Sequence, residues 1–228
     1  TTEIYTLSLH DALPILHPQL AVMDQADELA RAAAGGRVAA IGECGFDFYG
    51  DAPDTVRSAD NEKRQREAFE FQLDLAERHG LPIVLHMRRA NDLLFGYAKR
   101  LSGMRAVILH SWGGPANEAL DFLFRCPSAL FSFGNSIANG NKKSLSSAAA
   151  LPVSAILTET DAPYQPPRGI PDPAAKGERR PLLRGHSNFT DLPRIIGEIA
   201  SARGTATQAI EEMVRSEEHT SELQSPNT

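Results

Sequence analysis

Short apolar runs alternate with longer segments of helical periodicity along most of the chain. The apolar runs are RVAAIGE (37–43), LPIVLH (81–86), RAVILH (105–110), ALFSFG (129–134) and SAILTETD (154–161). Helical patterns cover 61–80, 91–101, 115–125, 141–149, 189–202 and 205–214. Strands that are apolar on both faces and separated by helices predict a parallel sheet built from strand–helix units. The predicted fold class is α/β, without an internal repeat or a second domain.

The longest helical pattern illustrates the signals. Phe69, Leu73 and Ala76 recur at helical spacing, and charged residues occupy other positions around the helix. Gly80 and Pro82 predict where it stops.

The composition is that of one ordinary globular domain. The 228 residues are 42% hydrophobic and 23% charged, which excludes a disordered or fibrous chain. A formal net charge of -6 excludes the overall basic character of a protein that coats nucleic acid, so an anionic substrate would need a local positive charge. Two cysteines, Cys44 and Cys126, cannot build a disulfide framework, and no apolar run is as long as a membrane span. We therefore expect a cytoplasmic protein without membrane association.

The two ends, 1–15 and 215–228, lack the periodicity of the rest. TTEIYTLSLHDALPI at the start matches one translated frame of a common adapter oligonucleotide used in DNA sequencing, and RSEEHTSELQS near the end resembles the opposite adapter. We expect both ends to be artefacts outside the fold and the domain to cover 16–214. Genuine exposed tails are the alternative.

Four apolar runs lead into a residue that can bind a metal: Glu43, His86, His110 and Asp161. The carboxyl ends of parallel strands form the face where α/β sheets and barrels bind ligands, so these side chains are expected to converge. Imidazole and carboxylate suit divalent first-row metals. A pair of such ions polarises a phosphoryl oxygen and lowers the pKa of bound water, so the pattern predicts a hydrolytic metal site.

Each of the four residues also has a simpler interpretation. A histidine at a strand end can serve only as a hydrogen-bonding residue. Asp161 precedes Ala-Pro and could form a turn, and Glu43 could be a solvated loop carboxylate. Four coincidences at one sheet edge favour the shared site.

Five segments resemble the TatD family of metal-dependent hydrolases, a branch of the amidohydrolase-like TIM barrels described as deoxyribonucleases. They are AIGECGFDFYG, QREAFEFQLDLAERHGLPIVLHMRRA, VILHSWGG, FSFGNSI and ILTETDAPY, and the match runs in order from about His17 to Val214. The resemblance implies a (β/α)8 barrel that cleaves phosphodiester bonds of DNA with metal-activated water. It implies two divalent ions, and the sequence does not distinguish among Mg, Mn and Zn. DNA is the expected substrate of the intact protein, and no obligate protein partner is evident from the sequence.

The resemblance also implies roles for particular residues. Glu43 would bridge the two metals, and His86 and His110 would be ligands of one of them. Asp161 would bind the other metal and act as general base, so the catalytic residues would be Asp161 and Glu43. Arg88, in the family's H-x-R position, would contact a substrate phosphate, with a surface salt bridge as the alternative.

Two further features admit both a substrate role and a structural role. Trp112 in HSWGG could stack on a base or only cap the barrel. The segment 163–187 is rich in Pro, Gly and basic residues, and could gather a nucleic-acid backbone or be a solvated tether.

The sequence departs from the family pattern at its start. Family members begin with a strand ending in His-x-His, and no His-x-His occurs in this sequence. Leu16-His17-Pro18 resembles the stretch that follows the third strand, so we expect strands one to three to be missing and a partial barrel of five strands to remain. His17, His79 and His186 are interpreted as structural or surface residues, and His17 is not expected to replace the missing pair.

These expectations leave three functions open. The first is a TatD-type deoxyribonuclease, a metal-dependent hydrolase of ester bonds, whose activity is impaired here by loss of His-x-His. The second is an amidohydrolase-like hydrolase of small esters or phosphotriesters, because one barrel edge hosts many chemistries. The third is a non-catalytic metal-binding fragment.

Overall fold

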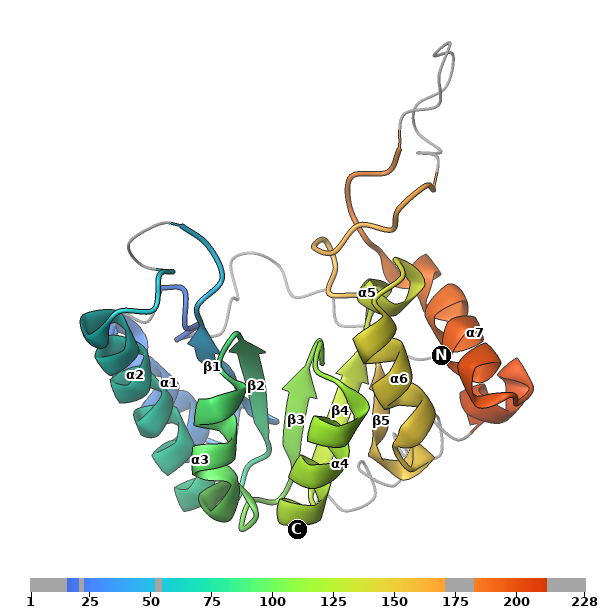
Figure 1. The fold of residues 1–228 in the computed structure, drawn as a ribbon. Coiled ribbons are helices and arrows are strands. Elements are labelled where there is room, and N and C mark those ends of the chain that lie inside the picture. The colour runs from blue at the N-terminus through green and yellow to red at the C-terminus, as the bar shows by residue number, and fades with distance from the viewer. Residues whose placement is uncertain (1–15, 21–22, 52–54, 171–182, 213–228) are drawn as a thin grey trace. The chain divides into compact units, whose positions relative to one another are not determined.

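The computed structural model describes residues 16–20, 23–51, 55–170 and 183–212, and its elements are shown in Figure 1. The chain forms two compact units. Among the described residues, the first unit comprises those up to Leu94 together with Met104–Ala106, and the second comprises Phe95–Gly103 and the residues from Val107 onward. Their boundary passes through helix α3 (Asn91–Leu101), and each unit is described by itself.

Two parallel strands and two helices form most of the first unit. Its elements are the 3-10 helix η1 (Met23–Gln25), α1 (Ala26–Ala34), β1 (Ile41–Asp47), α2 (Ala59–His79) and β2 (Ile83–Arg88). β1 and β2 pair in parallel, with Gly45 opposite His86 and Asp47 opposite Arg88. Helix α2 packs against β1.

Helix α2 begins and ends where its local chemistry requires. The Ser58 side chain accepts a hydrogen bond from the Asn61 backbone N–H, and Gly80 ends the helix in the left-handed conformation with φ 61°. Its buried face carries Phe69, whose ring meets that of Phe46 on β1 edge-on at 5.3 Å. These contacts fix α2 beside the strand that carries Glu43.

The second unit contains three strands that pair in parallel, β3 with β4 and β4 with β5. Its strands are β3 (Val107–His110), β4 (Ala129–Phe133) and β5 (Ile156–Thr158). Its helices are α4 (Ala116–Arg125), α5 (Asn135–Ala138), α6 (Lys142–Ala150), η2 (Val153–Ala155), η3 (Phe189–Asp191) and α7 (Leu192–Arg203), and residues 207–212 are also helical.

The predicted α/β class and its five strands are confirmed. Strand ends differ from the prediction: β1 continues to Asp47 and β2 to Arg88, whereas β5 ends at Thr158. His86 therefore lies inside β2 and does not end it. Helices α1 and α5 were not predicted. The expected artefacts at 1–15 and 215–228 lie outside the described residues, as does the middle of the basic segment, 171–182. Among the described helices, none combines the length and apolarity needed to cross a bilayer.

Helix α4 carries one buried and one exposed phenylalanine. The Phe122 side chain is fully buried, and its ring meets that of Phe95 edge-on at 5.7 Å. Phe124, two residues further along the same helix, is 85% exposed. The two residues therefore provide a matched pair for testing which face of α4 belongs to the core.

We expect Phe122→Ala to lower the free energy of unfolding by about 3–5 kcal/mol, because it leaves a cavity in the core. Phe124→Ala should change it by less than about 0.5 kcal/mol. Urea unfolding followed by circular dichroism measures both, and Phe122→Leu gives a milder change if the alanine variant does not fold. Equal effects of the two alanine substitutions would contradict this packing of α4.

Candidate metal centre

Two glycines place Glu43 against the neighbouring strand. Gly42 and Gly45 have φ of 142° and 131°, a region that favours glycine. A Cβ at Gly42 would lie 2.5 Å from the carbonyl oxygen of Val84, and one at Gly45 would lie 2.4 Å from that of His86. The motif Gly-Glu-Cys-Gly therefore lets β1 approach β2 at backbone distance. Glu43 lies within β1, at an irregularity of its register, so the prediction that it ends the strand is wrong.

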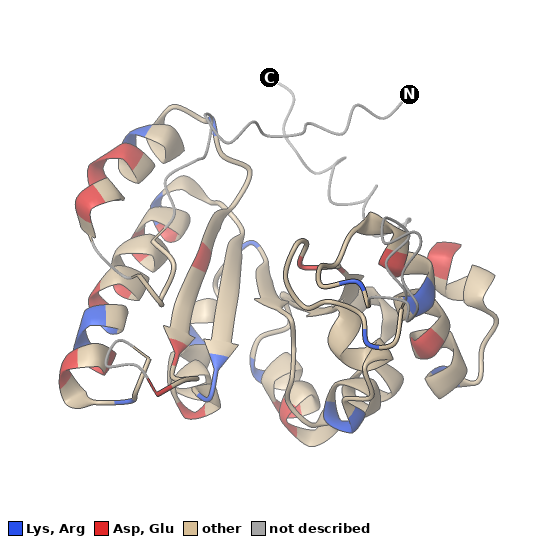
Figure 2. Cartoon of the chain, turned by 90° about the horizontal axis from the view of Figure 1, so that it is seen from above, with Lys and Arg blue, Asp and Glu red and all other residues tan. Residues whose placement is uncertain are grey.

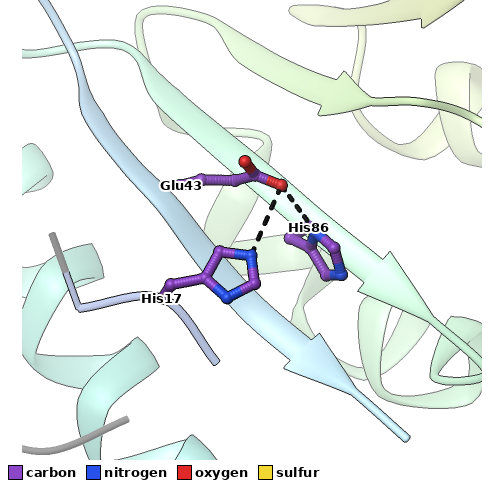
Figure 3. A group of neighbouring side chains, drawn as sticks. All are labelled: His17, Glu43 and His86. Atoms are coloured by element: carbon purple, nitrogen blue, oxygen red, sulfur yellow. Dashed lines mark hydrogen bonds and ion pairs between the residues drawn. The ribbon is translucent and has the colours of Figure 1, made fainter. Parts of the chain in front are cut away.

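The first cluster consists of His17, Glu43 and His86, drawn in Figure 3. Oε1 of Glu43 lies 2.5 Å from Nδ1 of His86 and 3.8 Å from Nε2 of His17. The two imidazole rings meet edge-on, with centroids 4.6 Å apart. His17, interpreted from the sequence as a structural or surface residue, thus belongs to a group whose geometry could hold a metal ion.

The donor set of the first cluster fits a divalent cation. One potential ligand atom from each residue lies within 4.8 Å of the others. Ligands held about 2.0–2.6 Å from one ion lie no more than about 4–5 Å apart. Two imidazole nitrogens and a carboxylate oxygen are also the ligand types that first-row divalent metals take.

Asp47 fixes the orientation of His86. Its side chain is fully buried, and its Oδ2 lies 2.9 Å from Nε2 of His86. The carboxylate also accepts hydrogen bonds from the Gln19 side chain and the Tyr49 backbone N–H, both at 2.9 Å. Because Asp47 occupies one ring nitrogen, the other nitrogen faces Glu43, as is typical of carboxylates behind metal-binding histidines.

Burial and hydrogen bonding act in opposite directions on this pair. Burial alone would lower the pKa of His86, but its hydrogen bonds to Asp47 and Glu43 and their negative charges raise the pKa above its ordinary value. Burial alone would raise the pKa of Asp47, but the hydrogen bonds from His86 and the Tyr49 N–H, with nearby positive charge, lower it. Asp47 is therefore ionised at neutral pH.

The second cluster consists of His110, Glu159 and Asp161 and lies within the second unit. Nδ1 of His110 lies 2.8 Å from Oε2 of Glu159, and Nε2 lies 3.5 Å from Oδ1 of Asp161. The hydroxyls of Ser111 and Ser132 donate to Glu159, each at 2.5 Å. Glu159 therefore holds His110 from behind, with Nε2 turned towards Asp161.

Asp161 follows β5 in a turn instead of ending the strand. Its φ is 55°, in the left-handed region, and the side-chain amide of Gln165 donates to its Oδ2 at 2.8 Å. The turn expected from Ala162-Pro163 is thus compatible with a carboxylate directed at His110. Turn formation and participation in the cluster are both present at Asp161.

The structure joins the four predicted ligands in two pairs, Glu43 with His86 and His110 with Asp161. Their convergence on one centre stays a prediction. Sequence reasoning missed Asp47 and Glu159 as participants. A signal was present, because both lie in the motifs GE-C-G-x-D and TETD beside the chosen residues.

The structure also describes the two residues that were predicted as possible substrate contacts, Trp112 and Arg88. Trp112 is buried, its ring meets that of Phe131 edge-on at 5.2 Å, and its Nε1–H donates to Ser147, so stacking on a substrate base is the wrong alternative. Arg88 is exposed at the end of β2, where its Nη1 lies 3.7 Å from Oδ2 of Asp47. The structure thus contains the ion pair expected as its alternative role.

Parallel strands that carry histidines backed by carboxylates are typical of metal-dependent hydrolases. Residues 14–219 match the model of the family described as TatD related DNase. The chain belongs to this family.

Two curated relatives match about three quarters of this chain. It is 31% identical over 171 residues to the uncharacterized metal-dependent hydrolase YjjV of Escherichia coli K12, covering 72% of this chain and 60% of the relative. It is 31% identical over 179 residues to the 3'-5' ssDNA/RNA exonuclease TatD of Klebsiella pneumoniae, covering 77% and 61%. The chain thus spans about three fifths of the length of these curated relatives.

Solved structures show the same fold. The crystal structure of YjjV, a TatD homologue from Escherichia coli K12, superposes with a TM-score of 0.72 at 26% identity, over 90% of this chain and 73% of the other. A hydrolase of the TatD family from Entamoeba histolytica gives a TM-score of 0.71 at 17% identity, over 90% and 72%. The second likeness supports the fold alone.

We expect His17→Ala to weaken the binding of Mn²⁺ or Zn²⁺ by at least about tenfold, because three candidate ligands become two. His79→Ala, which removes a histidine from the end of α2, is the matched control and should bind as the parent chain does. Isothermal titration calorimetry measures both. Unchanged affinity in His17→Ala would exclude His17 as a ligand.

A second prediction concerns the carboxylate behind His110. Glu159→Gln keeps the size of the side chain but removes the charge that faces Nδ1, so we expect metal affinity or activity to fall about 10–100-fold. Glu118→Gln on α4 makes the same chemical change outside the cluster and should have no such effect. If both variants bind metal equally well, Glu159 does not position His110.

Proposed function

We propose that this chain is the metal-binding part of a TatD-type deoxyribonuclease that cleaves phosphodiester bonds with metal-activated water. The observation that carries the proposal is the group of His17, Glu43 and His86, whose ligand atoms are close enough to share one ion. Membership of the TatD related DNase family supports it. A relative named as a 3'-5' ssDNA/RNA exonuclease supports single-stranded DNA as the substrate.

Each residue has a role that its contacts favour. Bound divalent ions would polarise a phosphoryl oxygen and lower the pKa of the attacking water. Glu43 would bind with one or both carboxylate oxygens, and His86 and His110 would supply neutral nitrogens. Asp161 would accept a proton from the attacking water, a step in which a placed carboxylate acts as general base.

Two residues would hold this arrangement without touching the substrate. Asp47 keeps His86 in the orientation that turns Nδ1 to Glu43. Glu159 keeps His110 in the orientation that turns Nε2 to Asp161. Because the histidines are preoriented, little ordering would be needed when an ion binds.

We also propose that activity is low. The sequence lacks the His-x-His of family members, and the chain spans about three fifths of its curated relatives. His17 adds one nitrogen to the first cluster, whereas the second has only His110 with carboxylates. We include in this proposal that the five strands are part of a (β/α)8 barrel whose first three strands are missing.

A single-turnover assay tests the function. With the chain in excess over a 5′-labelled single-stranded oligonucleotide, we expect slow shortening of the oligonucleotide in Mg²⁺ or Mn²⁺ and none in EDTA. Asp161→Asn should slow the reaction about 10²-fold or more, as loss of a general base does, and Asp121→Asn on α4 is the matched control.

The competing functions predict other results. Metal-dependent hydrolysis of small esters or phosphotriesters without any cleavage of DNA would favour the amidohydrolase-like alternative. Metal binding with neither reaction would favour the non-catalytic fragment. Either result would overturn the deoxyribonuclease proposal.

A further inference from the structure

Two consecutive arginines share one aromatic ring beside the first cluster. The guanidinium carbon of Arg88 lies 4.0 Å from the centroid of the Tyr49 ring, and that of Arg89 lies 4.7 Å from it. All three side chains are exposed, Tyr49 by 51%. We call these three residues the arginine pair and its ring.

The backbone brings both arginines to the same side. Neighbouring residues of a strand normally point to opposite faces. β2 ends at Arg88, and Arg89 has φ 55°, in the left-handed region that is unfavourable for a residue with a Cβ. This turn, with the hydrogen bond from the Phe48 N–H to the Arg88 carbonyl, lets both guanidinium groups reach the Tyr49 ring.

The arginine pair is connected to the first cluster through one carboxylate oxygen. Oδ2 of Asp47 lies 3.7 Å from Nη1 of Arg88 and 2.9 Å from Nε2 of His86. Arg88 also stands two residues after His86 on β2, which places both on the same face of the strand. A group bound by Arg88 would therefore lie next to the candidate metal ligands.

The arrangement favours an anion. Each cation–π contact stabilises an exposed guanidinium, but two positive charges on one ring repel each other. A phosphate placed between them removes that repulsion, and guanidinium groups match phosphate oxygens with two hydrogen bonds each. Elsewhere, acidic and basic residues are interspersed along the helices (Figure 2), and the chain carries a net charge of -6.

We propose that Arg88, Arg89 and Tyr49 form a clamp for a backbone phosphate of a single-stranded nucleic acid. The clamp rests on the proposed function for the identity of the strand, and on the contacts above for the phosphate. Tyr49 holds both guanidinium groups in place, and the arginines bind the phosphate next to the one presented to the first cluster.

The test measures binding without metal, so that cleavage cannot interfere. Fluorescence anisotropy of a labelled oligothymidylate in EDTA, at several salt concentrations, gives both affinity and its salt dependence. We expect Arg89→Ala to weaken binding about fivefold or more and to reduce the slope of log K against log salt by about 0.7, the value for one phosphate contact on a single strand. Arg78→Ala, at the far end of α2, is the matched control and should change neither.

Substitutions of Tyr49 test the role of the ring. Tyr49→Phe keeps the aromatic face and should bind as the parent chain does, whereas Tyr49→Leu should weaken binding. If the two variants bind equally well, the ring does not organise the clamp. If Arg89→Ala and Arg78→Ala have equal effects, the positive charge acts only through the net charge and the clamp is wrong.

Two further arms separate the phosphate source and the function. Inorganic phosphate at millimolar concentration should compete only weakly with the oligonucleotide; full displacement would indicate a site for free phosphate and overturn the assignment to a strand. If the parent chain cleaves DNA and the Arg89→Ala variant binds the oligonucleotide as well as the parent does, the clamp is rejected and the proposed function is kept. Loss of binding in Arg89→Ala without cleavage by the parent chain would support the clamp and reject the proposed function.

Discussion

A buried carboxylate, Asp47, is the constraint on which the first unit's site depends. Burying an ionised group is costly unless hydrogen bonds satisfy it, so its donors must stay in place. Its oxygens are satisfied by His86, the Gln19 side chain and the Tyr49 N–H. Its backbone N–H and carbonyl are held by the buried side chain of Gln65 on α2. One residue thus joins β1, β2, α2 and the segment that follows His17.

The second unit reaches a similar solution with different residues. Glu159 lies behind His110 and accepts hydrogen bonds from Ser111 and Ser132, as Asp47 accepts several donors behind His86. The nitrogen that is turned forward differs, Nδ1 in His86 and Nε2 in His110. Ring orientation at each site is therefore set by the carboxylate behind the histidine, not by the strand alone. A histidine's position in the sequence does not decide which nitrogen faces a metal.

Part of the fold and of the site could be predicted from the sequence. Apolar runs separated by helical periodicity were sufficient for the five strands, and residues at the run ends identified His86 and His110. Glu43 was placed wrongly in its strand because the register irregularity between Ile41 and Cys44, where Gly42 has a positive φ, is not visible in an apolar pattern.

The missed participants depend on long-range contacts. His17 meets Glu43 and His86 only after the chain has folded back over about 26 and 69 positions, and no local pattern encodes that return. Asp47 looks like any residue at a strand end, and its burial follows from the packing of α2. Trp112 is the opposite case, since a tryptophan in a glycine-rich stretch suggests an open pocket but belongs to the core.

The charge of the site connects the proposed metal centre with the proposed arginine clamp. Glu43 with Asp47 behind the first cluster, and Glu159 with Asp161 in the second, place two carboxylates at each site, and a nucleic-acid strand would be repelled by these carboxylates alone. Bound divalent ions would reverse the sign where the reaction occurs. Next to the first cluster, the same reversal needs fixed cations, and Arg88 supplies one while it pairs with Asp47. An acidic chain can thus hold an anionic strand only if positive charge is concentrated at these few points, which is the arrangement that a metal and a pair of arginines on one ring would provide.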